Sequence, residues 1–206
     1  MPTQAGRRPP SLAWGCSIRG LLLTPGLALL LTVGVAGCTR ITQANANIAF
    51  MGDSITALWW LPKSNLGVSG NTTAQMLDRL PGEIQDYRYD AMVILAGTND
   101  VRVVTTPIGE EVDSAISNIE QMAVLAEGKN IEVVLCLIPP IRGEDTRVNA
   151  LNAAITTLAQ QHQYKLVDYY TPMVNHPEYF RDGEHPNDEG YFVMQAALTK
   201  VIPLDY

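Results

Sequence analysis

The sequence predicts an α/β protein, a three-layer α/β/α sandwich built on a mostly parallel sheet of about five strands. Apolar runs bounded by turn residues recur along the chain, and the strongest are continuously hydrophobic, as in strands that are buried on both faces of a parallel sheet. Stretches with the period of a helix lie between these runs. This alternation of strand and helix favours one sandwich domain over residues 47–206.

The expected strands and helices follow one another in chain order, separated by turn residues. The strands are Asn47–Met51, Asn65–Val68, Ala91–Leu95, Ile131–Ile138 and Lys165–Val167. The helices are Thr72–Leu80, Glu110–Glu127, Thr146–Gln161 and Asn187–Val201. Gly128 marks a stop for the second helix, and Asn187 with Asp188 marks a start for the last. No internal repeat and no second domain boundary is visible.

Residues 1–37 are expected to be a lipoprotein-type signal peptide, outside the fold. An apolar run from Leu21 to Ala36 is preceded by three arginines, Arg7, Arg8 and Arg19, which is the layout of a signal peptide. The run ends in Val35-Ala36-Gly37-Cys38. This segment resembles a bacterial lipobox, and the resemblance implies that Cys38 is lipidated. Residues 38–46 then form a polar tether.

Two other interpretations of this segment stay open: an uncleaved membrane anchor, and an ordinary secretory signal in which Cys38 is incidental. The apolar run spans about 16 residues, which is short of the roughly 20 that cross a bilayer as a helix. The lipobox interpretation predicts a membrane-anchored lipoprotein of the bacterial cell envelope, facing the periplasm or the cell surface, with the membrane as a partner through its lipid.

The charge distribution argues against nucleic acid as a partner. All 21 acidic residues lie at Asp53 or later, whereas three of the 14 basic residues belong to the signal segment. Binding to nucleic acid needs Lys and Arg to neutralise phosphates, and no basic cluster is present. The acidity is explained by solubility.

Cysteine usage predicts no disulfide within the mature chain. Cys16 lies in the signal segment and Cys38 is the expected lipid attachment site, so only Cys136 remains. Cys136 lies in the apolar run Ile131–Ile138 and is expected to be a small buried hydrophobic residue.

Residues with hydrogen-bonding side chains or bare backbone N–H groups follow three of the expected strands, at the sheet edge where open α/β sheets bind ligands. Ser54 follows the first strand, Gly70 the second and Asn99 the third. Backbone N–H groups in a glycine turn and an Asn amide are donors that stabilise an oxyanion. Each motif alone is also ordinary turn or helix-cap chemistry.

A histidine and an acid share one loop before the last helix. Asp182 lies three residues before His185, and a carboxylate that holds one imidazole nitrogen allows the other to accept a serine proton. His162, at a helix end, and His176, in a loop, are weaker candidates for the base.

Together these motifs resemble the four blocks of the SGNH/GDSL hydrolases, in the family's order. They are Gly52-Asp53-Ser54, Gly67-Val68-Ser69-Gly70, Gly97-Thr98-Asn99-Asp100 and Asp182-Gly183-Glu184-His185-Pro186. The resemblance implies a flavodoxin-like fold with Ser54 as nucleophile and Asp182 and His185 completing a triad. It implies an oxyanion hole made by the Ser54 and Gly70 backbone N–H groups and the Asn99 side chain. Ile55 stands where the family has Leu, and Asp53 and Asp100 are interpreted as loop supports.

The implied activity is that of a serine esterase acting on acyl esters, without cofactor or metal. Short- or medium-chain esters and lysophospholipids are the favoured substrates, and acetylated glycans are the alternative. Trp59, Trp60 and Leu61 either form an apolar wall for the acyl chain or pack in the core.

Two other functions stay open as alternatives. A metal hydrolase would draw ligands from Asp168, His176, Asp182 and His185, but no known metal-binding spacing is present. A non-catalytic carbohydrate-binding or scaffold lipoprotein would keep the fold without turnover.

Overall fold

The computed structural model describes residues 47–61, 64–85, 88–102 and 107–202. Its centre is a sheet of five strands in the order β2-β1-β3-β4-β5, and every neighbouring pair is parallel. The strands are β1 (Ile48–Gly52), β2 (Ser64–Gly67), β3 (Ala91–Leu95), β4 (Glu132–Leu137) and β5 (Lys165–Asp168). The carboxyl ends of all five therefore lie along one edge of the sheet.

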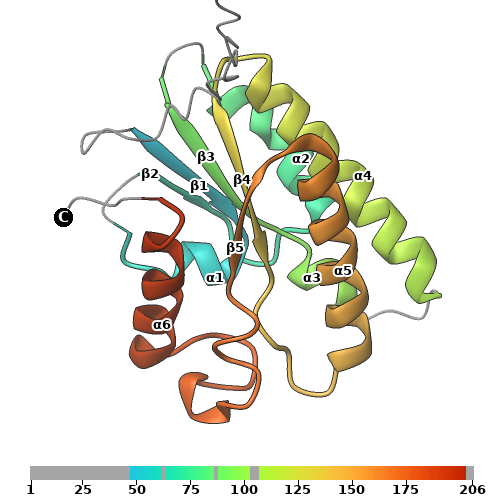
Figure 1. Cartoon of the computed structure of the whole chain (residues 1–206), viewed down its shortest axis with the longest axis vertical. Coiled ribbons are helices and arrows are strands. Elements are labelled where there is room, and N and C mark those ends of the chain that lie inside the picture. Colours follow the sequence, from blue (N-terminus) through green and yellow to red (C-terminus); the bar gives the residue numbers. More distant parts are fainter. Residues whose placement is uncertain (1–46, 62–63, 86–87, 103–106, 203–206) are drawn as a thin grey trace, which may run out of the picture. The chain divides into compact units, whose positions relative to one another are not determined.

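Helices cover both faces of this sheet (Figure 1). On one face pack α2 (Thr73–Glu83), α4 (Ile108–Glu127) and α5 (Asp145–His162), with the one-turn helix α3 (Thr98–Val101) between them. On the other face lie the one-turn helix α1 (Ser54–Ala57) and α6 (Asp188–Thr199), and a short 3₁₀ turn, η1 (Pro177–Tyr179), precedes α6. The predicted three-layer sandwich with a five-stranded parallel sheet is confirmed.

The two central strands are buried on both faces, as their continuous hydrophobic sequences predict. Every residue of β1 and β3 is buried, which accounts for the absence of polar alternation in these strands. The remaining strands lie within a residue or two of the expected ranges, and so do three of the four expected helices, whereas α2 continues three residues further. The one-turn helix α1 agrees with the helical turn that the sequence favours after Gly52, whereas α3 was not expected as a separate element, because four residues are too short to show a periodicity.

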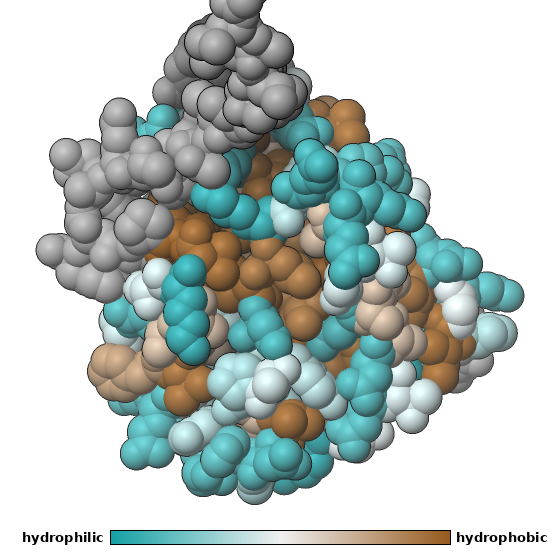
Figure 2. Space-filling view, viewed as in Figure 1, coloured by the Kyte–Doolittle hydropathy of each residue, from teal (hydrophilic) through white to brown (hydrophobic). Residues whose placement is uncertain are grey.

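The two faces of the sheet are covered unequally. Among the described residues, three long helices pack on one face, and α6 with the single turn of α1 packs on the other. A groove of about 470 Å³ lies between β5 and α6, lined mainly by apolar side chains such as Leu166, Val193 and Ala197. Figure 2 shows an apolar area near the middle of the viewed face, bordered by hydrophilic residues. Within the described residues, apolar side chains of β5 and α6 therefore line a surface groove.

Candidate active site

Ser54 begins a helical turn directly after the central strand β1. The preceding residue, Asp53, caps α1, because its Oδ1 atom accepts a hydrogen bond from the backbone N–H of Ile55 at 2.9 Å. A carboxylate at this position stabilises the start of a helix. The cap holds Ser54 at the carboxyl edge of the sheet, with only 8% of the residue exposed.

A chain of hydrogen bonds joins Ser54 to Asp182 through His185. The Ser54 Oγ and His185 Nε2 atoms are 2.9 Å apart, and His185 Nδ1 lies 2.8 Å from Asp182 Oδ2. An ionised carboxylate only accepts hydrogen bonds, so Nδ1 carries the proton and Nε2 is the acceptor for the Ser54 hydroxyl. In this arrangement a neutral imidazole can take the proton from a serine.

Backbone donors hold the Asp182 carboxylate in its ionised form. The backbone N–H groups of His185 and Glu184 donate to Asp182 Oδ1 at 2.9 and 3.0 Å. The bond from the His185 backbone, with smaller contributions from the His185 side chain and the Glu184 backbone, lowers the pKa of Asp182 to about 2. Asp182 is therefore charged at any pH at which an esterase is assayed, although 56% of its side chain is exposed.

The loops that carry Gly70 and Asn99 leave the same edge of the sheet as Ser54. The strand register places Gly52 beside both Gly67 and Leu95. Gly70 is the third residue of a turn closed by a hydrogen bond from Asn71 N–H to Val68 O at 3.1 Å, and its φ is +80°. A positive φ at this position is typical of a type II turn and favours glycine.

Asn99 and its neighbour tie these two loops together. Asn99, in α3, donates from Nδ2 to the carbonyl of Asn71 at 3.0 Å. The carboxylate of Asp100 accepts hydrogen bonds from the backbone N–H and the hydroxyl of Thr73, where α2 begins. The amide of Asn99 is therefore fixed beside the Gly70 turn, and Asp100 supports the loop.

Sequence analysis missed Arg79, which connects three of these segments. Its Nη2 donates to the carbonyls of Gly52 at 3.1 Å and Leu66 at 2.7 Å, and its Nε donates to Asn71 Oδ1 at 2.8 Å. The only sequence signal was a basic residue on an expected helix, which is ordinarily solvated. Its role depends on partners up to 27 positions away, and no local pattern reveals them.

Asp53 is a buried carboxyl beside the nucleophile. Burial raises the pKa of Asp53 to about 6, and the hydrogen bond from Ile55 N–H opposes this rise. The ordinary pKa of an Asp carboxyl is 3.8. Between pH 3.8 and about pH 6, Asp53 therefore keeps its proton in the folded protein but loses it in the unfolded chain. The free energy of unfolding consequently falls as the pH rises through this window.

Asp53→Asn is expected to remove that pH dependence, because Asn keeps the acceptor for Ile55 N–H but does not ionise. A pKa shift from 3.8 to about 6 corresponds to at most about 3 kcal/mol, at about 1.4 kcal/mol per unit. The variant is expected to gain stability relative to wild type between pH 4 and pH 7.5 by about this amount. Urea denaturation at both pH values measures it, and a difference that does not change with pH would contradict the assignment.

The two tryptophans after Ser54 have different environments. Trp59 is 4% exposed and its ring stacks on Tyr191 with centroids 5.5 Å apart. Trp60 is 46% exposed and its ring meets Phe192 at 5.2 Å. The sequence left open whether these side chains form an apolar wall for the acyl chain or pack in the core. Trp59 packs in the core and is therefore not part of such a wall.

The other histidines have partners of their own. His162 Nε2 lies 3.1 Å from Glu120 Oε1, and His176 Nδ1 lies 2.9 Å from Glu178 Oε1. Within the described ranges, no three His, Cys, Asp or Glu side chains are grouped in a way that would hold a metal ion. The side chains weighed as ligands for a metal hydrolase therefore form no such group.

The predicted targeting segment, including Cys38, lies outside the described residues, and its role stays a prediction. Among the helices that the structure describes, none has both the length and the apolar character to span a bilayer. Cys136 is 1% exposed in β4, as expected for a buried small residue, and burial raises the pKa of its thiol.

Comparison with protein families identifies one match that spans most of the chain. The profile of the GDSL-like Lipase/Acylhydrolase family matches residues 50–193, a range that contains the Ser54, Gly70, Asn99 and His185 motifs. No curated protein matches the chain.

Solved structures with the same architecture include lipases and esterases of several bacteria. A GDSL-like lipase from Bacteroides thetaiotaomicron is 30% identical, covers 74% of this chain and 85% of its own, and has a TM-score of 0.65. A lipase/acylhydrolase from Enterococcus faecalis is 25% identical over 76% of this chain and 94% of its own, with a TM-score of 0.64. An acetyl-xylooligosaccharide esterase variant from a Geobacillus species is 16% identical over 80% and 97% of the two chains; its TM-score of 0.69 reflects the shared fold alone.

Proposed function

Because this chain belongs to the GDSL-like Lipase/Acylhydrolase family and is an ester hydrolase, we propose that it cleaves acyl esters through a covalent intermediate on Ser54. The observation that supports this proposal best is the hydrogen-bond chain from Ser54 Oγ through His185 to Asp182, with contacts of 2.9 and 2.8 Å. It joins a nucleophile, a base and a group that orients the base.

The proposed reaction is acyl transfer to water. His185 takes the Ser54 proton as Oγ attacks the ester carbonyl, and the resulting imidazolium is stabilised by Asp182. The tetrahedral oxyanion is held by the backbone N–H groups of Ser54 and Gly70 and by Asn99 Nδ2. His185 then returns the proton to the leaving alcohol, and a water molecule hydrolyses the acyl-enzyme by the same steps.

Asn99→Ala is expected to lower kcat for p-nitrophenyl acetate by about 10²–10³, with little change in KM. The reason is that the amide would stabilise charge that develops only in the transition state. Initial rates measured over a range of ester concentrations give kcat and KM separately.

Asn99 also donates a hydrogen bond to the Asn71 carbonyl, so Asn99→Ala removes support from this loop as well as an oxyanion donor. A control variant must therefore weaken the loop without removing an oxyanion donor. Asn118 Nδ2 donates to Thr73 Oγ1 at 3.0 Å and supports the same region without reaching the oxyanion. Asn118→Ala is expected to keep kcat within a few-fold of wild type. Equal losses in the two variants would count against an oxyanion role for Asn99.

The proposed substrates are acyl esters of two kinds. Short- and medium-chain esters and lysophospholipids come first, since an envelope enzyme meets them at the membrane. Deacetylation of glycans is the alternative, and the family accommodates both. A panel of nitrophenyl esters of increasing chain length, lysophosphatidylcholine and acetylated oligosaccharides ranks these substrates by kcat/KM. A non-catalytic scaffold would hydrolyse none of them.

We also propose that the mature protein begins at a lipidated Cys38 and is held at the bacterial envelope. The support is the order of the arginines, the apolar run and Val35-Ala36-Gly37-Cys38. Fractionation of cells tests it: Cys38→Ala should move the protein from the membrane fraction to the soluble fraction, and unchanged membrane retention would count against the lipid anchor.

A further inference from the structure

The guanidinium of Arg79 joins the ends of the two strands that lead to Ser54 and Gly70. Its Nη2 atom donates to the carbonyl of Gly52, where β1 ends, at 3.1 Å, and to the carbonyl of Leu66 in β2 at 2.7 Å. Ser54 follows Gly52 by two residues, and Gly70 follows Leu66 by four. One planar side chain therefore fixes both segments that would present backbone N–H groups to an oxyanion.

A third contact of Arg79 reaches the turn that contains Gly70. Its Nε atom donates to Asn71 Oδ1 at 2.8 Å. Asn71 closes this turn, because its backbone N–H donates to the carbonyl of Val68 at 3.1 Å. The carbonyl of Asn71 in turn accepts a hydrogen bond from Asn99 Nδ2 at 3.0 Å. Arg79 and Asn99 therefore hold the Gly70 turn through the same residue.

Arg79 uses most of its hydrogen-bonding capacity in these contacts. Besides Nε and Nη2, its Nη1 atom pairs with Glu83, one turn further along α2. Four of its five N–H groups thus have acceptors in the protein, and only 19% of the side chain is exposed. Because the guanidinium is rigid and planar, it fixes the relative positions of the groups that it binds.

The distances within an oxyanion hole leave little tolerance. Each donor has to lie about 2.7–3.1 Å from the oxygen in its transition-state position, and a misplacement of about 1 Å can lower the rate about 10²-fold. The Gly70 N–H belongs to a turn after β2, whereas the Ser54 N–H begins a helix after β1. Their separation therefore depends on contacts between the two segments, and Arg79 bonds to both.

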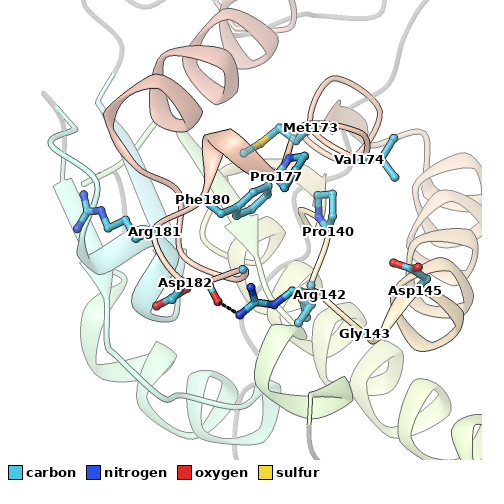
Figure 3. Close-up of a pocket in the computed structure, with 12 residues that line it drawn as sticks. Pro140, Arg142, Gly143, Asp145, Met173, Val174, Pro177, Phe180, Arg181 and Asp182 are labelled. Carbon is cyan, nitrogen blue, oxygen red and sulfur yellow. Dashed lines mark hydrogen bonds between the residues drawn. The ribbon is translucent and has the colours of Figure 1, made fainter.

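A second arginine supports the loop of the base but is bound less completely. Arg142 Nη2 donates to the carbonyl of Asp182 at 2.6 Å (Figure 3). Arg142 is exposed and lines a surface cavity of about 370 Å³, where water can replace this bond. Arg79 is more enclosed and joins acceptors from three segments, so its loss is expected to displace the backbone further.

We propose that Arg79 is a positioning residue of the oxyanion hole, which keeps the Ser54 and Gly70 backbone N–H groups at the separation that a tetrahedral oxyanion requires. The proposal rests on the proposed serine esterase function and adds a residue that touches neither the substrate nor the reacting atoms. Because Arg79 acts through the two loops, its loss weakens binding of the transition state and leaves binding of the ester nearly unchanged.

The kinetic test compares Arg79→Met with Arg88→Met, which makes the same change of charge and shape at another site. Arg88 is exposed, and its guanidinium lies over the ring of Tyr89, 5.2 Å from the centroid. Arg79→Met is expected to lower kcat for p-nitrophenyl acetate about 10- to 10²-fold, with KM within about threefold of wild type. Arg88→Met is expected to keep kcat within about twofold of wild type. Equal losses in the two variants would contradict the proposal.

A boronic acid distinguishes displaced donors from a loss of folded protein. Phenylboronic acid adds to a serine oxygen and forms a tetrahedral anion, so its Ki reports on the oxyanion hole. The Ki of Arg79→Met is expected to rise by about the same factor as kcat falls. If the substitution only unfolded part of the protein, kcat would fall, but the folded fraction would bind the boronic acid as wild type does. An unchanged Ki would therefore overturn the role of Arg79.

Arg79→Lys is the second variant, because loss of the whole guanidinium could prevent folding. An ammonium group keeps the charge and still donates to carbonyls, but Lys has no counterpart of Nε, which binds Asn71. The Ki for phenylboronic acid is expected to rise about threefold to tenfold in this variant. If Arg79→Met does not fold, Arg79→Lys decides, and a wild-type Ki would overturn the proposal.

These outcomes are separable from a failure of the serine mechanism. If wild type hydrolyses p-nitrophenyl acetate and Ser54→Ala does not, the mechanism stands, and the Ki values alone decide on Arg79. If Ser54→Ala is as active as wild type, the serine mechanism fails, and the role of Arg79 fails with it.

Discussion

Ser54→Ala is expected to hydrolyse p-nitrophenyl acetate about 10⁴–10⁶ times more slowly than wild type, because it lacks the nucleophile. The substitution removes one oxygen from a residue that is only 8% exposed, and with it the 2.9 Å contact to His185 Nε2. The backbone of α1 does not depend on this oxygen, since Asp53 provides the cap. The thermal midpoint is therefore expected to stay close to that of wild type.

A fluorophosphonate probe gives an independent measurement of the same residue. The probe forms a stable bond only with an activated serine, so wild type should be labelled, and peptide mass analysis should place the label on Ser54. The Ser54→Ala protein should remain unlabelled. A label on another serine, or full activity in the variant, would refute the nucleophile assignment, and a folded wild type that resists labelling would favour a non-catalytic scaffold.

The strand ends were predictable because they depend on local sequence. Strands β1 and β3 are continuously apolar and fully buried, and their ends are marked by Gly52 and Gly97. Once a parallel sheet is expected, the residues just beyond its strands must share one edge. This reasoning predicts that Ser54, Gly70 and Asn99 lie in one region, and the strand register agrees with it.

The supporting contacts were not predictable, because each joins segments that are far apart in sequence. Arg79 bonds to the carbonyls of Gly52 and Leu66, and Arg142 bonds to Asp182, 40 positions away. A basic residue in a loop or on a helix is most often solvated, so its identity alone carries no signal. The buried Glu184 was likewise hidden within a motif that is defined by its neighbours Asp182 and His185.

Asp182→Asn is expected to lower kcat by about 10³–10⁴ while the protein stays folded. The carboxylate has a pKa of about 2, so the ionised form accepts from His185 Nδ1 and from two backbone N–H groups. The amide of Asn replaces one accepting oxygen by a donor. If the oxygen stays with the backbone donors, the NH₂ group faces Nδ1 and favours the tautomer whose proton is on Nε2. That imidazole cannot accept the Ser54 proton.

The control for this variant is Asp188→Asn, which neutralises a nearby and still more exposed acid, in the first turn of α6, without touching His185. Its kcat is expected to stay within about threefold of wild type, because surface charges at this exposure have small effects. Both variants are assayed above pH 5, where a pKa of about 2 keeps the wild-type Asp182 ionised. If kcat of Asp182→Asn falls by less than tenfold, the loop backbone around His185, and not the Asp182 carboxylate, orients the imidazole. A loss of the expected size with an unchanged thermal midpoint assigns the effect to the tautomer of His185.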